Sequence, residues 1–266
     1  MRYPSTLAVA LAASVFLPSL FADTNLIVNP GAETGAAGPA VPGWTTTGTF
    51  EVVAYSAGGG FPALTDPGSP NRAQKFFSGG QGGALSSALQ TISLDAFSAA
   101  IDSSSQGFTL SGWLGGFSSQ DDHCDINVTF LSASAGTLGQ ATIGGVRASQ
   151  RNWLTGMLFR TTSGVVPAGT RSARVEILMT REAGSYNDGY ADDLSLTLHS
   201  ACVCDLNGDA LVEDSDFSIF VVAYNTLDCA DPSMTPDCPA DFNRDGLVDD
   251  SDFSIFVVAY DALLCP

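Results

Sequence analysis

The C-terminal part of the chain is an internal repeat, which restricts the fold of that part more than any other feature of the sequence. Residues 205–229 read DLNGDALVEDSDFSIFVVAYNTLDC and residues 241–265 read DFNRDGLVDDSDFSIFVVAYDALLC. The offset between the copies is 36, and 18 of the 25 aligned residues are identical. Such a duplication indicates one supersecondary unit used twice. The chemistry of one copy should therefore recur in the other.

Each copy opens with oxygen-bearing side chains at alternate positions. Positions 1, 3, 5, 9 and 12, with a backbone carbonyl at 7, follow the spacing of a calcium loop of EF-hand type. The predicted ligands are Asp205, Asn207, Asp209, Leu211, Glu213 and Asp216 in the first copy, and Asp241, Asn243, Asp245, Leu247, Asp249 and Asp252 in the second. Calcium takes about 6–8 oxygen ligands, whereas the small octahedron of magnesium prefers to keep waters. We therefore expect two calcium ions here.

Two details of the loops lead to further expectations. The apolar residues at the eighth position, Val212 and Val248, are predicted to face inward and to pair the two loops. At the sixth position Ala210 stands where the second copy has the turn glycine Gly246. Because alanine tolerates a positive φ poorly, the first loop is predicted to bind calcium more weakly.

Each loop is followed by the run DSDFSIFVVAY, which carries apolar residues at helical spacing. These residues are Phe217, Phe220, Val221 and Tyr224, repeated as Phe253, Phe256, Val257 and Tyr260. No helix-like run precedes either loop, and the twelfth ligand is Asp instead of the usual Glu. This duplicated loop–helix pattern, about 60 of the 266 residues, resembles the dockerin module of cellulosome-type assemblies. The version with cysteines and many phenylalanines resembles the dockerin-type anchors of planctomycete-like secreted proteins.

The resemblance to dockerins implies a small all-α, calcium-binding domain that docks onto a cohesin-like or cell-surface protein. In that family, the residues just before the last ligand help to choose the partner. Here they are Asp214 and Ser215 in the first copy, and Asp250 and Ser251 in the second. Because the two pairs are identical, the resemblance implies docking in either of two orientations.

The charge of the chain is concentrated in the same region. The sequence has 28 Asp and Glu against 10 Lys and Arg, a net charge of −18. Residues 202–266 hold 14 of the acids and only one base, Arg244, and so account for −13 of that charge. A strongly acidic balance argues against nucleic acid and anionic membranes as partners. The step in composition predicts a domain boundary near Ser200.

The N-terminus has the pattern of a secretory signal peptide over residues 1–22. Arg2 precedes an apolar run from Leu7 to Leu20, and small Ala22 follows. Ser14 and Pro18 interrupt that run, which argues against a membrane anchor, and no second hydrophobic segment of spanning length follows. The mature chain is expected to be secreted, extracellular or on the cell surface, with the periplasm as an alternative, and without a membrane span.

Export permits disulfides, and the chain has six cysteines. The symmetry of the repeats makes Cys202–Cys229 and Cys238–Cys265 the simplest pairing, one bond per copy. Cys204 has no counterpart and is expected either to pair with Cys124 or to remain free. Sequence alone leaves the connectivity open.

Residues 23–200 have short alternating stretches separated by Gly, Pro, Ser and Asn, which predicts an all-β sandwich. Candidate strands are Asn25–Asn29, Phe108–Leu114, Ile126–Leu131, Ala173–Thr180 and Ala191–Leu198, with one helical turn around Leu94–Ile101. The predicted domains are therefore a signal peptide at 1–22, a mainly β sandwich at 23–200, and the dockerin-like domain at 201–266.

The two ends of this region resemble secreted jelly-roll modules of the carbohydrate-binding and galactose-binding-like group. The resemblance rests on NLIVNPGAETG at the opening and YADDLSLTL at the close. It implies a jelly-roll sandwich with a further calcium ion between Glu33 and either Asp192 or Asp193. Sugar binding would need exposed aromatic platforms with polar neighbours; candidates are Trp113, Phe117, Trp153, Tyr186, Asn187 and Tyr190. For each of them, packing in the core is the alternative.

No catalytic motif is evident in the sequence. His123 and Cys124 are neighbours, but adjacent residues on an extended strand point to opposite faces, which argues against a nucleophilic dyad. Paired carboxylates for glycoside hydrolysis could come from anywhere in the chain. The preferred hypothesis is a secreted, non-catalytic, calcium-dependent protein whose sandwich binds polysaccharide and whose C-terminus docks. The rivals are a glycoside hydrolase or polysaccharide lyase with a catalytic sandwich, and a structural cell-surface component.

Overall fold

The structure, a computed structural model, describes residues 24–103, 106–201, 204–207, 211–235, 238–243 and 245–262. The predicted signal peptide therefore lies outside the described residues. So do the predicted ligand Asp209, the loop residue Ala210, and the cysteines Cys202 and Cys265. Expectations about these residues stay predictions.

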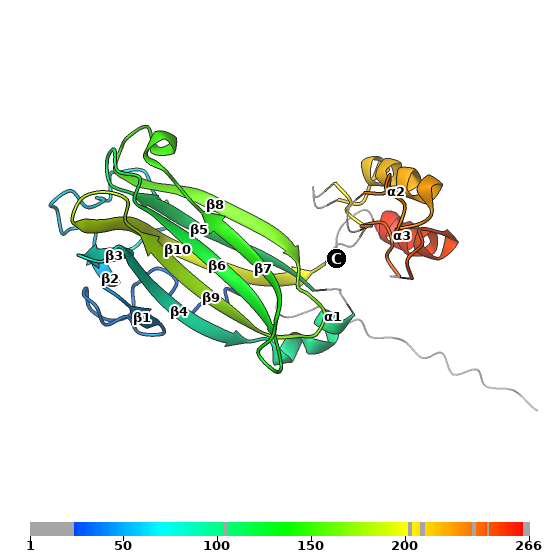
Figure 1. The fold of residues 1–266 in the computed structure, drawn as a ribbon, viewed down its shortest axis with the longest axis horizontal. Coiled ribbons are helices and arrows are strands. Elements are labelled where there is room, and N and C mark those ends of the chain that lie inside the picture. Colours follow the sequence, from blue (N-terminus) through cyan, green and yellow to red (C-terminus); the bar gives the residue numbers. More distant parts are fainter. Residues whose placement is uncertain are drawn as a thin grey trace, which may run out of the picture.

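Strands are the predominant regular elements of the described chain (Figure 1). The strands are β1 (Thr45–Thr47), β2 (Glu51–Ala54), β3 (Lys75–Gln81), β4 (Leu85–Ser93), β5 (Gln106–Gly116), β6 (His123–Ser132), β7 (Thr137–Gly144), β8 (Gly156–Val165), β9 (Thr170–Thr180) and β10 (Tyr186–Ser200). The helices are η1 (Asp95–Phe97), α1 (Ser98–Asp102), η2 (Ala148–Arg151), α2 (Asp214–Thr226) and α3 (Asp250–Ala262). The predicted turn around Leu94–Ile101 corresponds to η1 and α1.

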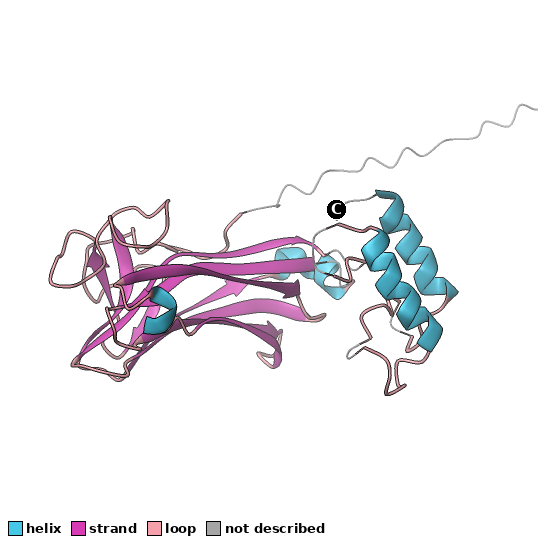
Figure 2. Ribbon diagram, turned by 90° about the horizontal axis from the view of Figure 1, so that it is seen from above, coloured by secondary structure: helices cyan, strands magenta, loops and turns pink. Residues whose placement is uncertain are grey.

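The strands form two five-stranded sheets that face each other as two layers (Figure 2). One sheet has the order β1-β4-β9-β6-β7 and the other β2-β3-β10-β5-β8. All the strand pairs recorded in the two sheets are antiparallel. The prediction of a β-sandwich is therefore confirmed.

The main hydrophobic core lies between the two sheets, and the alternation of residue types explains why. In β9, Ala173, Val175, Ile177 and Met179 are buried, while the side chain of Arg174 between them is exposed. Side chains of a strand alternate between its faces, so one face of β9 joins the core. Leucines of β10 and β5 meet this face from the other sheet.

The opening segment of the domain runs along β10 without forming a regular strand. The backbone N–H of Leu26 donates to the Leu196 carbonyl at 2.8 Å, and the Asn25 amide donates to the Leu194 carbonyl at 2.8 Å. The prediction of a strand at Asn25–Asn29 is wrong, because side chains supply much of the pairing and Asn29 has a positive φ of 51°. The two ends of the domain nevertheless lie side by side.

Helices α2 and α3 lie side by side outside the two layers of the sandwich (Figure 2). We call the described residues from 204 to 262 the paired-helix unit. Its buried cluster includes Val212 and Phe220 from the first copy and their counterparts Val248 and Phe256. The rings of Phe220 and Phe256 stack with centroids 5.3 Å apart. Among the described residues, no helix has the length and apolar character needed to cross a membrane.

Candidate functional site

The second loop brings its six predicted ligand positions into one closed turn. Asp241 accepts hydrogen bonds from the backbone N–H of Asp245 at 3.2 Å and of Gly246 at 2.9 Å. Asp245 in turn accepts from the N–H of Leu247 at 3.0 Å. Gly246 has a φ of 92°, a conformation that glycine adopts without strain. The carboxylates of Asp241 and Asp245 are thus held by backbone N–H groups of their own loop.

The last predicted ligand of each loop is a buried aspartate that closes the loop. Asp252 is fully buried and accepts from the N–H groups of Phe242 at 2.7 Å, Asn243 at 3.0 Å and Asp249 at 3.0 Å. Asp216 makes the equivalent bonds in the first loop, again between 2.7 and 3.0 Å. The two copies therefore share one geometry at this position.

The charges of these loops have no basic neighbour within the described part of the paired-helix unit. Residues 204–207, 211–235, 238–243 and 245–262 contain no Lys, Arg or His. Carboxylates brought together repel one another unless a cation is present. The donor set also consists of oxygens only, which suits a hard cation such as calcium.

The two loops meet through their valine side chains as expected, but the recorded backbone contacts of the second loop are to the segment after α2. Val212 and Val248 are both buried in one cluster, as expected. The recorded bridge of the second loop, however, joins Leu247 to Asp228, and the N–H of Val248 donates to the Leu227 carbonyl at 2.8 Å. The second loop is thus braced by the segment that follows α2.

The cysteine pairing expected from symmetry is wrong. Cys229 and Cys238 form a disulfide with each other, so Cys229 cannot pair with Cys202, nor Cys238 with Cys265. The bond links the two copies across the segment between them, which a one-bond-per-copy rule could not foresee. Cys124 and Cys204 are both free and buried, and burial raises the pKa of the Cys204 thiol to about 11.

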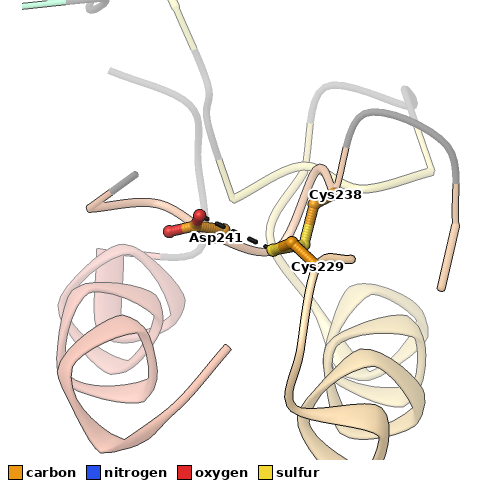
Figure 3. A group of neighbouring side chains, drawn as sticks. All are labelled: Cys229, Cys238 and Asp241. Carbon is orange, nitrogen blue, oxygen red and sulfur yellow. Dashed lines mark hydrogen bonds between the residues drawn. A yellow bond between two sulfur atoms is a disulfide. The ribbon is translucent and has the colours of Figure 1, made fainter. Parts of the chain in front are cut away.

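The disulfide lies directly beside Asp241, the first predicted ligand of the second loop (Figure 3). The Cys229 sulfur is 3.6 Å from Asp241 Oδ2, and the N–H of Asp241 donates to the Cys238 carbonyl at 3.0 Å. Two sulfurs and a carboxylate so close together could suggest a metal site. Because both sulfurs are consumed in the disulfide, neither is a thiolate ligand.

The second acidic cluster predicted by the sequence lies where the opening segment meets β10. The carboxylate of Asp192 is buried and accepts the Tyr55 hydroxyl at 2.6 Å. Burial, together with the charges of Asp193 and Glu33, raises the pKa of Asp192 to about 7. A Cβ at Gly31 would lie only 3.2 Å from an Asp192 oxygen and 3.3 Å from an Asp193 oxygen, so glycine leaves room for both carboxylates.

Two observations place Asp193 and Glu33 differently within this cluster. Asp193 Oδ2 is buried and finds no hydrogen-bond donor among the described residues. Glu33 instead uses Oε1 to accept from the N–H groups of Gln74 at 2.8 Å and Lys75 at 2.7 Å. Asp192 and Asp193 are therefore the inner members, and Glu33 stands at the rim.

Three of the four residues predicted to choose the docking partner, Asp214, Ser215 and Asp250, have side-chain hydrogen bonds within the unit. The Tyr224 hydroxyl donates to Asp250 at 2.6 Å, and Tyr260 donates to Asp214. Ser215 donates to Glu213 at 2.9 Å and so belongs to its own loop, while Ser251 bonds Asp249 through its backbone N–H at 2.8 Å. Each helix start is thereby fastened to the other helix's end, so the two helices run in opposite directions.

The aromatic candidates for sugar binding fall into three groups. Asn187 and Tyr190 are fully buried, which removes them from any ligand surface and corrects that prediction. Trp113, Phe117 and Tyr186 are partly buried, and the first two pack on a second hydrophobic cluster that contains Tyr190. Trp153 is 62% exposed.

The exposed Trp153 lies in the connection between β7 and β8, directly after η2 and the buried Arg151. Asn152 and Trp153 both have left-handed backbone, with φ of 53° and 57°. The buried guanidinium of Arg151 donates to the carbonyls of Gly116 at 2.7 Å and Gln120 at 2.8 Å. Sequence reasoning missed Arg151, because an isolated arginine gives no sign of where it will be buried.

Two other residues were also missed by sequence reasoning. Phe159 of β8 is half exposed, and its ring lies 5.7 Å from that of Trp113 on the outer face of the sheet. Asp122 is fully buried and accepts from the N–H groups of Glu182 at 2.7 Å and Ala183 at 2.9 Å. Asp122 is therefore a structural carboxylate that holds the turn before β10.

His123 and Cys124 show no catalytic pairing. Cys124 faces the core, where burial raises the pKa of its thiol well above the ordinary value. The His123 ring lies 3.5 Å from Asp125 and 3.0 Å from the Asp121 carbonyl. A buried neutral thiol is a poor nucleophile. The alternation of the strand thus separates the two side chains, as expected.

No family model and no curated protein matches the chain. A family 16 carbohydrate-binding module aligns with a TM-score of 0.38 and 20% identity over 65% of this chain and 99% of that module. Tandem family 22 modules of Paenibacillus barcinonensis Xyn10C align at 0.37 and 14%, over 73% and 50%. The enzymatically active domain of a bacteriophage CBA120 tailspike aligns at 0.42 and 18%, over 66% of this chain and 21% of that one. Likenesses at these scores carry no assignment of function.

Proposed function

We propose that the paired-helix unit is a small calcium-dependent docking domain of dockerin type, which tethers a secreted sandwich to a cohesin-like or cell-surface partner. The observation that supports this proposal is the hydrogen bonding of Asp241, Asn243 and Asp252 to backbone N–H groups of their own loop, at the spacing of an EF-hand-type calcium loop. Calcium bound there would neutralise the carboxylates and hold the start of α3. The equivalent ion would sit in the first loop.

Calcium titration of the mature chain by isothermal calorimetry tests the proposal. We expect two sites in the unit, and Asp252→Asn should remove the second one. Asp261→Asn is the matched control, because Asp261 is an exposed acid of α3 outside the loops. The weaker first loop predicted from Ala210 would appear as Asp241→Ala costing more affinity than Asp205→Ala. Absence of calcium binding by both loops would refute the proposal.

A third calcium ion is proposed between Asp192, Asp193 and Glu33 in the sandwich. The buried Asp193 oxygen without a donor supports it, because such an atom is costly unless a cation or water compensates it. Burial first, and then the charges of Asp193 and Glu33, raise the pKa of Asp192, and a bound cation would offset both effects. Loss of one binding event in Asp193→Asn, with the loop sites retained, is the expected result.

A second candidate function, glycan binding by a jelly-roll-like sandwich, rests on the exposed aromatic side chains. An indole 62% exposed on a braced loop can stack on the apolar face of a pyranose ring. The Trp113 and Phe159 pair offers a second platform. A glycan array with Trp153→Ala and Phe159→Ala separates the two surfaces. Release of reducing or unsaturated sugar would instead establish an enzyme, and no glycan binding would favour a structural component.

A further inference from the structure

Two grooves of equal size lie on the paired-helix unit, one for each copy of the repeat. One has a volume of about 270 Å³ and is lined by Asp214, Phe217, Phe253, Phe256, Val257 and Tyr260. The other, also about 270 Å³, is lined by the counterparts 36 residues away, Asp250, Phe253, Phe217, Phe220, Val221 and Tyr224. The grooves are therefore related by the pseudo-symmetry of the repeat.

Phe217 and Phe253 line both grooves and form the ridge between them. Each ring remains 40% exposed, and their centroids are 6.4 Å apart. Val221 and Val257 extend the apolar surface along the two helices. Exposed aromatic rings beside well-packed neighbours are typical of the central residues of protein interfaces. None of these apolar helix residues is a predicted calcium ligand, so the calcium loops do not explain why this face is apolar.

The rim of each groove carries negative charge only. Asp214 and Asp250 are groove residues, and the described part of the unit contains no basic side chain. A second copy of the chain would bring the same two acids to the same face, which disfavours self-association. A partner with Lys or Arg around its apolar contact is instead complementary.

The tyrosine contacts hold Asp214 and Asp250, two of the residues expected to choose the partner, at the groove rims. Asp214 and Asp250 accept hydrogen bonds from Tyr260 and Tyr224 at the groove walls. Each carboxylate is thereby held at a groove rim. Ser215 is engaged within its own loop. The groove face, instead of the loop end, is left for a partner's apolar side chain.

We propose that the two Phe217–Phe253 grooves are the docking surface, and that they bind a protein segment with a protruding apolar side chain flanked by Lys or Arg. This inference rests on the proposed docking function, and it replaces the loop-end serines with the aromatic ridge as the recognition element. Either groove accepts the apolar side chain, because the two have the same lining.

The test uses the full mature chain and three synthetic peptides, Lys-Lys-Phe-Leu-Lys-Lys, Glu-Glu-Phe-Leu-Glu-Glu and Lys-Lys-Ser-Ser-Lys-Lys. Binding is followed by NMR shifts of the aromatic rings of the unit, with calcium and with chelator. Only the peptide that is both basic and apolar should bind at this face. Phe217→Ser with Phe253→Ser should weaken it at least ~10-fold, as expected when central aromatic residues are truncated.

Added charge provides a variant that keeps the aromatic packing. Val221→Lys with Val257→Lys should abolish binding, because both residues line the grooves. Val222→Lys with Val258→Lys adds the same charge at more exposed positions outside the grooves, and binding should persist. An equal loss of peptide binding in both double variants would show that the added net charge alone causes it, and would overturn the proposal.

The remaining outcomes separate this proposal from the calcium proposal. Equal binding of all peptides, no binding, loss only in Ser215→Ala with Ser251→Ala, or dimerisation through this face would each overturn the groove assignment. Groove-dependent binding that ignores chelator would retain the docking surface and refute its dependence on calcium. Calcium binding without peptide binding would retain the calcium sites and refute the docking surface.

Discussion

The sandwich and the paired-helix unit satisfy their polar and apolar groups in different ways. The sandwich encloses a core between two sheets and meets the buried charges of Asp122 and Arg151 with its own backbone. The paired-helix unit has a much smaller cluster and leaves Phe217 and Phe253 partly exposed. Small units of this kind usually need metals, disulfides or partners for stability.

This contrast indicates that the two regions respond to different conditions. The sandwich should be stable by its own burial, apart from the acidic cluster around Asp192. The unit should depend on ions in its loops and on the Cys229–Cys238 disulfide. The predictions below test that division, beginning with the largest expected effect.

Removal of calcium should unfold the paired-helix unit and leave the two-sheet core folded. A ligand present at about 100 times its Kd raises the free energy of unfolding by ~2.7 kcal/mol. Two such sites therefore contribute about 5 kcal/mol. Circular dichroism should show loss of helix in chelator, since α2 and α3 hold most of the described helical residues. The near-ultraviolet signal of the sandwich aromatics is the internal control. A helical signal that ignores both calcium and chelator would contradict this expectation.

In chelator, the stability of the sandwich should fall as the pH rises from about 4 to about 7. The pKa of Asp192 is raised from 3.8 to about 7 in the folded protein, so the folded state holds its proton through a range in which the unfolded state has lost it. The folded state thus binds more protons there, and the free energy of unfolding decreases with pH, by up to ~4 kcal/mol.

Asp192→Asn isolates that effect, because the Tyr55 hydroxyl can still donate to the amide oxygen. Urea unfolding at pH 5 and pH 8 should show a smaller difference in the variant than in the native chain. Calcium should reverse the trend in the native chain only, since it favours the charged carboxylate. The same pH dependence in both proteins would assign the slope to other groups.

The pattern of side chains along the chain predicts the loops and strands well, because these depend on local spacing. Strands β9 and β10 cover the predicted strands Ala173–Thr180 and Ala191–Leu198, and α2 and α3 follow the two predicted loops. The same pattern does not predict contacts between residues that are far apart in the sequence. Tyr55 meets Asp192 across 137 residues, and nothing near either residue marks the pair.

The repeat was a sound guide to the fold of each copy and a misleading one for the links between copies. Helical spacing predicted one apolar face per helix, but the crossing of α2 and α3 buries Phe220 and leaves Phe217 partly exposed. The same limit applies to the Cys229–Cys238 bond, which depends on where the connecting segment returns. Symmetry between copies does not determine how the copies are joined.

Loss of the disulfide should weaken the second loop by a moderate amount. Cys229 and Cys238 are nine residues apart, and closing a loop of about this length is worth ~2–3 kcal/mol. Cys229 and the two residues before it hold Gly246, Leu247 and Val248 through backbone contacts. Cys229→Ser with Cys238→Ser should therefore lower the calcium affinity of the second loop by calorimetry and leave the melting of the sandwich unchanged. Unchanged affinity would separate the disulfide from the calcium site.

The smallest expected effect concerns the two tyrosine–aspartate contacts between the helices. Hydrogen bonding to Asp250 and its charge raise the pKa of Tyr224, and Asp214 does the same for Tyr260. The bonds therefore stabilise the pair below the ordinary tyrosine pKa of about 10 and are lost as the pH rises through the raised value. Asp250→Asn and Asp214→Asn should each lower the pKa of the facing tyrosine by NMR titration, with little change in stability because the groups are exposed. The pseudo-symmetry requires equal decreases, so a clear difference between the two would show that the helices are not equivalent in solution.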